Sequence, residues 1–368
     1  MQLVKTGRDE VLRPLQIVSG IVERRHTLPI LSNILIRKQG NDVSFLATDT
    51  EIQIITHAPI GTDEEDITTT VSAKKLLDTL RSLPDDSNVS LSLNDKKMAI
   101  AGSGSRFQLQ TLPGDDFPIV NQPEEFLGSI SLPQKDFKEL LGMVSFAMAQ
   151  QDLRYYLNGV LLQFVEGKIN AVATDGHRLA TCSIQSSDET LKQDLIIPRK
   201  TAIELQRLLE DNETPVKIDF AKTQIRFTFG SVELISKLVE GKFPDYTRVI
   251  PQNYDQKFAI GRDSLQRALQ RAAIMTTEKY KGIRWILSPG SLKISSTNAD
   301  QEEAVIELET AFNGEGFEIG FNITYLIDVV AALKNDIIQI EVKDGNSSVL
   351  ITIPDNSSFK YVVMPMRI

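Results

Sequence analysis

Apolar and polar positions along the chain repeat one arrangement three times. In each repeat, two mostly apolar stretches flank a turn rich in Gly or Asn and lead into a bend of Thr followed by Asp or Asn. Apolar stretches joined by such short turns are typical of paired β-strands. The bend threonines lie 126 and 123 residues apart, which indicates a repeat of about 125 residues. The three segments read NILIRKQGNDVSFLATDTEIQI (33–54, with Thr48), NGVLLQFVEGKINAVATDGHRLA (158–180, with Thr174) and KGIRWILSPGSLKISSTNADQEEA (281–304, with Thr297).

Helical patterns flank each strand pair. Before each pair, apolar residues spaced i, i+4 and i+7 lie on one helix face, as do Val11, Leu15 and Val18. After each pair a second pattern follows, in which Asp78, Glu204 and Asp328 are equivalent, 126 and 124 residues apart. Pro14 inside the first pattern disfavours that helix start, because proline removes a backbone hydrogen bond. The predicted helices are 8–20, 72–83, 134–150, 198–211, 262–274 and 322–334.

Alternating strands follow each second helix, with Asn-Asp, Asp-Gly or Gly-Ser turns that predict antiparallel hairpins. Each repeat is therefore expected to be an α+β domain of two helices packed on antiparallel sheet. Stretches containing Pro and Asn, 121–127 and 249–255, mark the boundaries. We expect three tandem similar domains at 1–125, 126–253 and 254–368. Three domain-sized copies favour a symmetric binding surface over an enzyme with one site.

Charge is divided unevenly between the helices and the rest. The chain has a net charge of −9, but the six predicted helices hold 14 Lys and Arg against 10 Asp and Glu, so the remainder is −13. Basic helical faces on an acidic protein suit contact with a polyanion on one surface. The alternative is ordinary solvated helices. The basic pairs are Lys74 and Lys75, Arg199 and Lys200, and Arg267 and Arg271.

Composition excludes several classes of protein. With 41% hydrophobic and 24% charged residues, the chain is typical of globular proteins, and its apolar runs are too short for a membrane span. The charged N-terminal stretch does not resemble a signal peptide, so we expect a cytoplasmic protein. One cysteine, Cys182, excludes an intrachain disulfide, and we expect it to be a buried, inert thiol. The three histidines lack zinc-site spacing.

The bend of the second repeat, ATDGHRLA (173–180), groups several reactive residue types. Asp175 and His177 could form an acid–base pair. However, only Thr and the acid or amide recur in the other repeats, which favours a turn residue bonding its own backbone. The residues special to this repeat would then be a pocket wall, with Arg178 and His177 on its rim. They are Gly176, His177, Arg178 and Leu179.

Two further stretches are candidate contact surfaces. The turn QQDLRYYLN (150–158) combines Arg154 with Tyr155 and Tyr156, a combination that can hold nucleic acid but is also common on plain surfaces. The C-terminal stretch YVVMPMRI (361–368) is apolar, with two methionines around a proline. Such a stretch suits either a strand docked in a sheet or an adaptable surface for several partners.

Five stretches, in order along the whole chain, together resemble the β subunit of bacterial DNA polymerase III, the sliding clamp family. They are HTLPILSN (26–33), RYYLNG (154–159), ATDGHRLA (173–180), SKLVEGKFPDY (236–246) and YVVMPMRI (361–368). The resemblance implies the DNA clamp fold, closed as a head-to-tail homodimeric ring with helices around the hole. It implies a protein that encircles double-stranded DNA without reading its sequence and tethers the replicative polymerase, with no catalytic activity, cofactor or metal.

The resemblance also implies a pocket for short peptides similar to Gln-Leu-x-Leu-Phe. Its partners would be the polymerase III catalytic subunit, the clamp loader, other polymerases, and mismatch-repair or ligase proteins, with no membrane partner. Burying two or three large apolar side chains, at about 1.5–3 kcal/mol each, fits micromolar-class binding. The implied pocket residues are Leu157, Thr174, Gly176, His177, Arg178, Leu179, Pro244, Arg248, Val249, Ser348, Val362, Met364, Pro365 and Met366, with Arg367 and Ile368 at the edge.

The resemblance also implies which residues of this sequence contact DNA and which form the ring interface. DNA contacts are implied at Arg25, Gln151, Tyr155, Tyr156, Arg199 and Lys200. At the interface, Phe107 would pack on Ile274 and Met275 of the second copy, while Lys75 and Arg106 would face Glu302 and Glu303. Two rival functions stay open at this point: a hydrolase that uses Asp175 and His177, and a peptide-binding scaffold that does not bind DNA.

Overall fold

The structure, a computed structural model, describes residues 1–368 except 24–27, 63–64, 187 and 368. The chain divides into two compact units. Unit 1 comprises Met1–Lys135 and Ile203–Leu238, and unit 2 comprises Asp136–Ala202 and Val239–Ile368. Each unit is described by itself.

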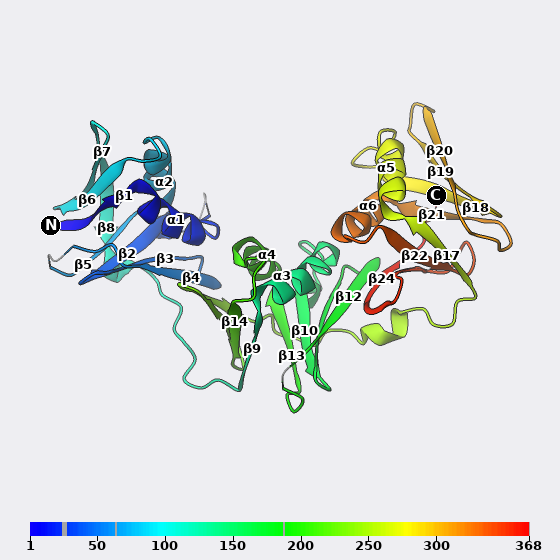
Figure 1. Ribbon diagram of the computed structural model, residues 1–368, viewed down its shortest axis with the longest axis horizontal. Coiled ribbons are helices and arrows are strands. Elements are labelled where there is room, and N and C mark those ends of the chain that lie inside the picture. The colour runs from blue at the N-terminus through cyan, green and yellow to red at the C-terminus, as the bar shows by residue number, and fades with distance from the viewer. Residues whose placement is uncertain (24–27, 63–64, 187, 368) are drawn as a thin grey trace. The chain divides into compact units, whose positions relative to one another are not determined.

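Unit 1 is built on a 12-stranded antiparallel sheet whose order is β1-β6-β7-β8-β5-β2-β3-β4-β16-β15-β14-β9. Helices α1 (Arg8–Ser19) and α2 (Ala73–Arg81) pack together beside it (Figure 1). Its strands are β1 (Gln2–Gly7), β2 (Asn33–Gln39), β3 (Asp42–Thr48), β4 (Ile52–Ala58), β5 (Ile67–Ser72), β6 (Asn88–Asn94), β7 (Lys97–Gly102), β8 (Ser105–Pro113), β9 (Gly128–Pro133), β14 (Pro215–Phe220), β15 (Gln224–Phe229) and β16 (Val232–Lys237).

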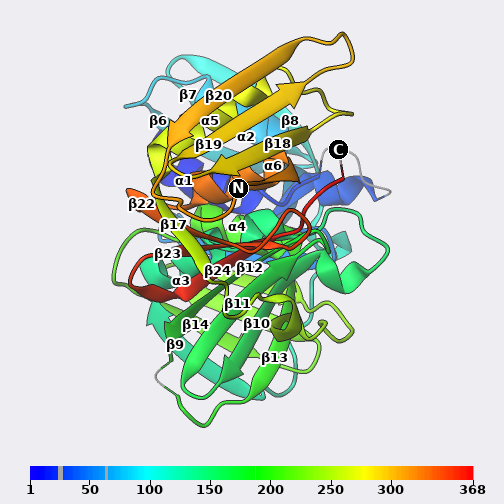
Figure 2. The ribbon, with the colours of Figure 1, turned by 90° about the vertical axis from the view of Figure 1, so that its right-hand side faces the viewer.

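Unit 2 contains an eight-stranded sheet, β13-β10-β11-β12-β24-β23-β22-β17, and a four-stranded sheet, β20-β19-β18-β21 (Figure 2). Helices α5 (Arg262–Ala273) and α6 (Ile323–Ala332) pack together here. The strands are β10 (Gly159–Val165), β11 (Lys168–Thr174), β12 (Arg178–Gln185), β13 (Gln193–Pro198), β17 (Gln256–Gly261), β18 (Gly282–Ser288), β19 (Ser291–Thr297), β20 (Glu303–Glu309), β21 (Phe317–Asn322), β22 (Ile337–Val342), β23 (Val349–Ile353) and β24 (Asn356–Val363).

The threefold repeat and the α+β class predicted from the sequence are confirmed. Strands β2-β3-β4, β10-β11-β12 and β18-β19-β20 are equivalent antiparallel meanders, and β6-β7-β8, β14-β15-β16 and β22-β23-β24 form a second equivalent set. The turn of the first meander places a glycine in the left-handed region in all three repeats, with φ of 55°, 68° and 81° at Gly40, Gly167 and Gly290. Gly40 is the first of its two turn residues, whereas Gly167 and Gly290 are the second. This left-handed conformation favours glycine, which explains the Gly-rich turns of the sequence pattern.

Consecutive repeats are joined edge to edge by the same pair of strands. Strand β4 of the first repeat pairs with β16 of the second, for example at Ile54 and Leu234. Strand β12 of the second repeat pairs with β24 of the third, for example at Ala180 and Tyr361. In the described part of the chain, β20 of the third repeat pairs only with β19. On β8 of the first repeat, residues 105–110 pair only with β7 among the described strands.

All six helices end before their predicted last residue, and two of them differ in a way that has a clear physical reason. Helix α1 begins at Arg8 and continues through Pro14, whose missing hydrogen bond does not interrupt it. The predicted helix 134–150 is too long, because α3 (Gln134–Gly142) ends at Gly142 and a separate turn of 3-10 helix, η3 (Ser145–Ala147), follows it. Glycine is a poor helix former and commonly lies at helix ends. The remaining helix, α4, spans Arg199–Leu208.

The predicted inward faces are buried. Val11, Leu15 and Val18 of α1 are fully buried, as are the equivalent Leu265, Leu269 and Ala272 of α5. Cys182 is buried as expected, and burial raises the pKa of its thiol to about 11. In the part of the chain that the structure describes, no helix is long and apolar enough to cross a membrane.

Candidate partner-binding site

The bend of the second repeat is held by its own side chains. The Asp175 Oδ1 atom accepts hydrogen bonds from the backbone N–H groups of His177 and Arg178, at 2.9 and 3.0 Å. The Thr174 hydroxyl donates to the Arg178 carbonyl at 2.6 Å. The first repeat forms the same bonds from Asp49 and Thr48. The prediction that the recurring acid is a turn residue is therefore confirmed.

This geometry commits the Asp175 carboxylate to its own bend. The bonds that the structure gives Asp175 run to backbone N–H groups and to the Arg178 guanidinium, and the His177 N–H among them is that of the main chain. Moreover, the described residues include no group of three or more His, Cys, Asp or Glu side chains that could hold a metal ion. In the described structure Asp175 therefore stabilises its own bend and, through Arg178, the surface beside it.

An apolar cavity of about 160 Å³ lies beside this bend in unit 2 and is called the first cavity here. Strand β12 contributes Leu179, which stands opposite Val362 of β24 in the sheet register. The cavity is built on an apolar cluster that also includes Leu157, and Tyr246 packs against that cluster. The lining residues are Arg154, Leu157, Thr174, Gly176, His177, Arg178, Leu179, Pro244, Asp245, Tyr246, Val249, Val362 and Met364.

Most of the residues implied for the peptide pocket lie together in this cavity. The ten that line it are Leu157, Thr174, Gly176, His177, Arg178, Leu179, Pro244, Val249, Val362 and Met364. Arg248 is largely exposed and pairs with Asp245 at 2.8 Å, and the Ser348 carbonyl accepts a bond from Tyr254. Pro365, Met366 and Arg367 line a different, more polar cavity of about 620 Å³. Ile368 lies outside the described residues.

Sequence reasoning missed three lining residues, Arg154, Asp245 and Tyr246. Arg154 was assigned to a possible nucleic-acid surface, but its guanidinium pairs with Asp152 at 2.8 Å and donates to the Asp175 carbonyl at 3.2 Å. The bonds from Arg154 lower the pKa of Asp152 to about 2, so the pair is ionised at neutral pH. Asp245 and Tyr246 belong to the quoted stretch SKLVEGKFPDY, which was the available signal.

The C-terminal stretch 361–367 combines both expected alternatives, a strand docked in a sheet and an exposed apolar surface. Strand β24 docks between β12 and β23 as far as Val363, which is fully buried. The chain then leaves the sheet, and the Met364 N–H donates to the His177 carbonyl at 2.9 Å. Met364 and Met366 beyond it are 40% and 45% exposed. The end of strand β24 therefore brings Met364 to the first cavity, while Met366 lies at the other, more polar cavity.

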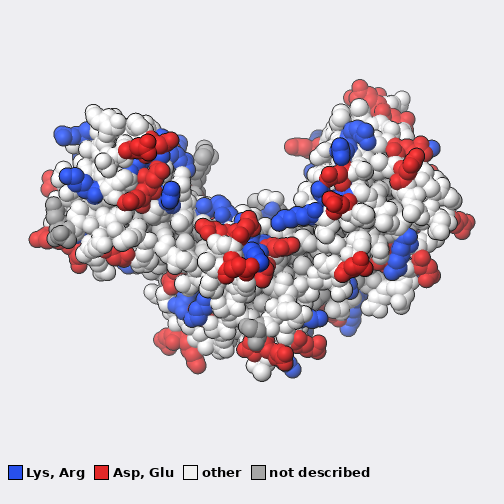
Figure 3. Space-filling model, viewed as in Figure 1, with Lys and Arg blue, Asp and Glu red and all other residues white. Residues whose placement is uncertain are grey.

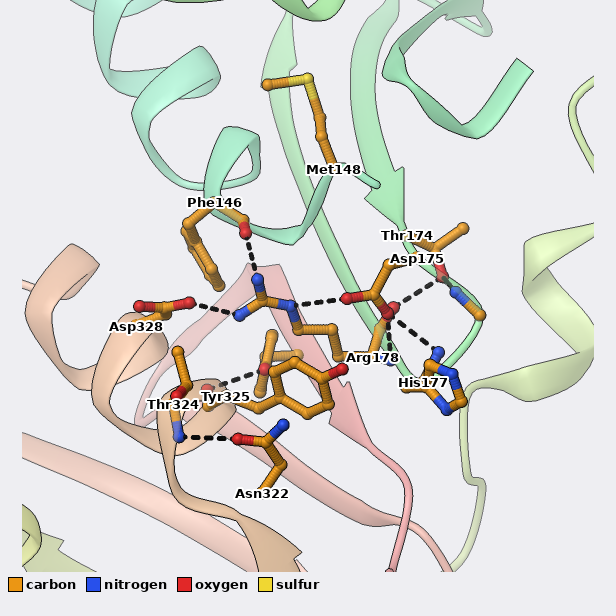
Figure 4. A network of polar contacts seen from close by, with 12 residues as sticks. Phe146, Met148, Thr174, Asp175, His177, Arg178, Asn322, Thr324, Tyr325 and Asp328 are labelled. Carbon is orange, nitrogen blue, oxygen red and sulfur yellow. Dashed lines mark hydrogen bonds and ion pairs between the residues drawn. The ribbon is translucent and has the colours of Figure 1, made fainter. Parts of the chain in front are cut away.

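Arg178, which was expected on the rim of the pocket, lines the cavity as a buried residue. Its guanidinium donates to Asp175 at 3.1 Å, to Asp328 at 2.6 Å and to the Phe146 carbonyl at 2.6 Å (Figure 4). Its Cζ lies 4.5 Å from the centre of the Tyr325 ring. Burial, the largest influence, lowers the pKa of Arg178, but nearby Tyr361 and the two carboxylates outweigh it and raise that pKa.

The residues implied for DNA contact lie at several places. Gln151 and Tyr155 are exposed on the turn that precedes β10, while Tyr156 is half-buried against the apolar cluster. Arg199 and Lys200 begin α4 and are partly exposed. Arg25 lies outside the described residues. Acidic and basic side chains are interspersed over the face seen in Figure 3.

The residues implied for a ring interface lie on or next to β8 and β20, each of which has an edge that pairs with no other described strand, and on or next to helices α2 and α5. Arg106 and Phe107 lie on β8, and Glu303 begins β20. Ile274 follows α5 and is 72% exposed, which is unusual for a large apolar side chain. The other three, Lys75, Met275 and Glu302, are exposed or partly exposed.

Comparison with known proteins gives one consistent result. Residues 2–121, 131–245 and 247–367 match the N-terminal, central and C-terminal domains described for the DNA polymerase III beta subunit. The chain is 43% identical over 364 residues to the beta sliding clamp of Pseudomonas putida and 40% identical over 361 residues to that of Escherichia coli, in each case across 98% of both chains. It is similar in structure to a Pseudomonas aeruginosa sliding clamp bound to griselimycin, with a TM-score of 0.94, 42% identity and full coverage of both chains. The chain therefore belongs to the family of DNA polymerase III beta subunits, the beta sliding clamps.

Proposed function

We propose that the protein encircles duplex DNA as a ring, slides along it and tethers the replicative DNA polymerase. The main support is the match of three tandem clamp domains along the whole chain, with relatives named beta sliding clamps. We assign these domains to residues 1–125, 126–253 and 254–368. A tethered polymerase re-engages its template before it diffuses away, so processivity follows from a high effective concentration.

The unpaired edges of β8 and β20 support a head-to-tail homodimer. At each junction, the last strand of the first meander in one repeat pairs with the last strand of the second meander in the next repeat: β4 with β16, and β12 with β24. By the same pattern, β20 would pair with the strand equivalent to β16 and β24, which is β8. A single chain leaves both edges open, so two copies can complete each other twice and close a ring. The interface we propose comprises Lys75, Arg106, Phe107, Ile274, Met275, Glu302 and Glu303.

DNA binding in such a ring needs charge but no base contacts. Exposed lysines and arginines on the helices, including Lys74, Lys75, Arg267 and Arg271, would attract phosphates without reading bases. We propose that DNA contacts come from Arg25, Gln151, Tyr155, Tyr156, Arg199 and Lys200.

The first cavity is the proposed docking site for partner proteins. Its apolar walls and the exposed Met364 suit a short peptide with large apolar side chains, such as Gln-Leu-x-Leu-Phe. The partners we propose are the polymerase III catalytic subunit, the clamp loader, other polymerases, and mismatch-repair or ligase proteins. We propose further that the protein acts in the cytoplasm and catalyses no reaction, the chemistry being that of the docked enzymes.

A topological experiment tests the ring. The protein, loaded by its clamp loader onto nicked circular duplex DNA, should remain bound during gel filtration and should dissociate when a restriction enzyme linearises the DNA. Equal retention on both forms would mean that the protein grips DNA and does not enclose it. A scaffold that binds peptides but not DNA would bind neither form, and a particle mass of one chain, 41.0 kDa, instead of two would also contradict the ring.

A further inference from the structure

The first cavity shares a wall with a second, polar cavity. The second cavity has a volume of about 530 Å³, lies in the same unit and includes Phe146, Tyr325 and Asp328 in its lining. Two residues, His177 and Arg178, line both cavities. Arg178 therefore separates an apolar space from a polar one.

The partners of the guanidinium show which side it faces. Its Nη1 atom binds Asp328 and its Nη2 atom binds the Phe146 carbonyl, both at 2.6 Å (Figure 4). Phe146, Asp328 and Tyr325, whose ring lies 4.5 Å from the Arg178 Cζ, line the second cavity but not the first. The charged end of Arg178 is thus directed into the polar cavity, and the rest of the residue forms the wall of the apolar one.

Of the two carboxylates that bind the Arg178 guanidinium, Asp328 is the one that belongs to another secondary-structure element. Asp175 belongs to the same bend as Arg178, whereas Asp328 lies on α6, in the third repeat. The equivalent acid of the second repeat, Glu204, likewise binds an arginine, Arg207, which donates to the carbonyls of Gln16 and Ile17. In both cases the acid orients an arginine that holds a main-chain carbonyl from the preceding repeat.

Without Asp328, the guanidinium loses a short charge-assisted bond. Such bonds are about twice as strong as neutral ones. An arginine side chain is long and flexible, and Arg178 also lines the apolar first cavity, so a guanidinium that Asp328 no longer holds can turn into that cavity. A charged group there would occupy the space that an apolar peptide side chain needs, and peptide binding would then require its removal and desolvation.

We propose that Asp328 is a positioning residue for partner docking: it holds the Arg178 guanidinium in the polar cavity and so keeps the first cavity open and apolar. It never contacts the peptide and acts only through Arg178. The inference rests on the proposed function of the first cavity as a peptide site.

A graded series of variants tests the proposal, with a fluorescein-labelled pentapeptide, Gln-Leu-Ser-Leu-Phe, as the probe in fluorescence anisotropy. Asp328→Ala should weaken peptide binding about tenfold, since it removes one of the three acceptors of the Arg178 guanidinium, on a helix that tolerates alanine. Asp328→Asn keeps an acceptor but not the charge, so its affinity for the peptide should lie between those of Asp328→Ala and the unsubstituted protein. Asp328→Glu keeps the charge and should bind within about threefold of the unsubstituted protein. Asp336→Ala, at an exposed acid just beyond the same helix, is the matched control and should change nothing.

A double-variant cycle separates positioning from a general structural effect. In an Arg178→Met background there is no guanidinium to hold, so adding Asp328→Ala should leave the affinity unchanged. An equal loss in both backgrounds, or full affinity of Asp328→Ala alone, would overturn the proposal. If Arg178→Met does not fold, as its thermal melt would show, the order of the graded series decides alone. Failure of the unsubstituted protein to bind the pentapeptide would instead refute the proposed function of the cavity.

Discussion

At the residue scale, the features that recur between repeats are structural, and those that do not recur form the site. Asp49 and Asp175 make the same two main-chain bonds, and the second bend lines the first cavity. The difference lies in the residues after the acid. Gly176, with φ of 88°, lies against the Arg154 guanidinium, and Arg178 reaches Asp328. The second repeat thus forms one wall of a cavity without altering the shared turn.

The two tail methionines differ in their expected effect on peptide binding. Met364 lines the first cavity, whereas Met366 lines another, and the two are similarly exposed. Met364→Ala should therefore weaken pentapeptide binding about tenfold, because most of an apolar contact worth about 1.5–3 kcal/mol is lost. Met366→Ala is the matched control and should bind within about twofold. Equal losses in isothermal titration calorimetry would indicate that the peptide extends along the tail.

Cys182 should be unreactive in the folded protein. Burial raises the pKa of its thiol from 9.0 to about 11, so at pH 8 the thiolate is about 100-fold rarer than in the unfolded chain. Maleimide labelling at pH 8 should be slower than in denaturant by at least that factor. From pH 9 to 11 the unfolded chain releases the proton first, so the free energy of unfolding should fall as pH rises. Cys182→Ala should lack this component, and rapid labelling of the native protein would contradict the assignment.

At the element scale, helix α1 obtains from another segment what its own sequence lacks. Its last turn has no basic residue, and the last four carbonyl groups of a helix have no N–H partner within the helix itself. Arg207 of α4 donates to two of them, Gln16 and Ile17, at 3.2 and 2.7 Å, and is held by Glu204. Gly20 lies directly against Arg207 and Glu204, where an added Cβ would clash.

Arg207→Ala should therefore destabilise unit 1. The loss of two charge-assisted bonds at a helix C-terminus is expected to lower the free energy of unfolding by about 1–2 kcal/mol. Arg13→Ala removes an exposed charge from α1 itself and is the control. Chemical denaturation followed by circular dichroism would compare them, and equal stability of the two variants would show that Arg207 does not support α1.

The elements also show how far the sequence could be interpreted. Helix faces, meanders and turn glycines follow from periodicity, because each repeat had two others to compare with it. The end of α3 at Gly142 was missed, because apolar spacing continues through Val144 into the buried η3 turn. The burial of Arg178 could not be predicted either. It depends on Asp328, 150 residues away, and no local pattern connects the two.

At the scale of the whole molecule, the repeat leaves one junction incomplete. Glu204 and Asp328 each hold an arginine that binds the preceding repeat, but the equivalent Asp78 is exposed in a single chain. The same is true of the strands, since among the described strands β20 and residues 105–110 of β8 each have one edge without a neighbouring strand. Open edges favour uncontrolled pairing unless another chain covers them. A head-to-tail second copy would pair the open strand edges and, at the same junction, cover Asp78.

Charge reversal at these edges provides a specific test of the head-to-tail arrangement. Arg106 lies on β8 and Glu303 on β20, so a ring would bring each against the other copy's counterpart, twice per dimer. An exposed pair contributes about 0.2–1 kcal/mol, and reversal replaces this attraction with repulsion at both interfaces. Arg106→Glu should thus raise the dimer dissociation constant by about tenfold or more in sedimentation equilibrium at low salt.

Arg106→Glu combined with Glu303→Arg should restore the dimer, because each new glutamate then faces a new arginine. Lys168→Glu, at an exposed position of β11 in the second repeat, serves as the charge-matched control and should dimerise normally. Recovery in the double variant requires that β8 of one copy meets β20 of the other. A dimer in which β8 meets β8 would instead place the glutamates of the double variant against each other and stay dissociated, so the result distinguishes a closed head-to-tail ring from a symmetric pair of edges.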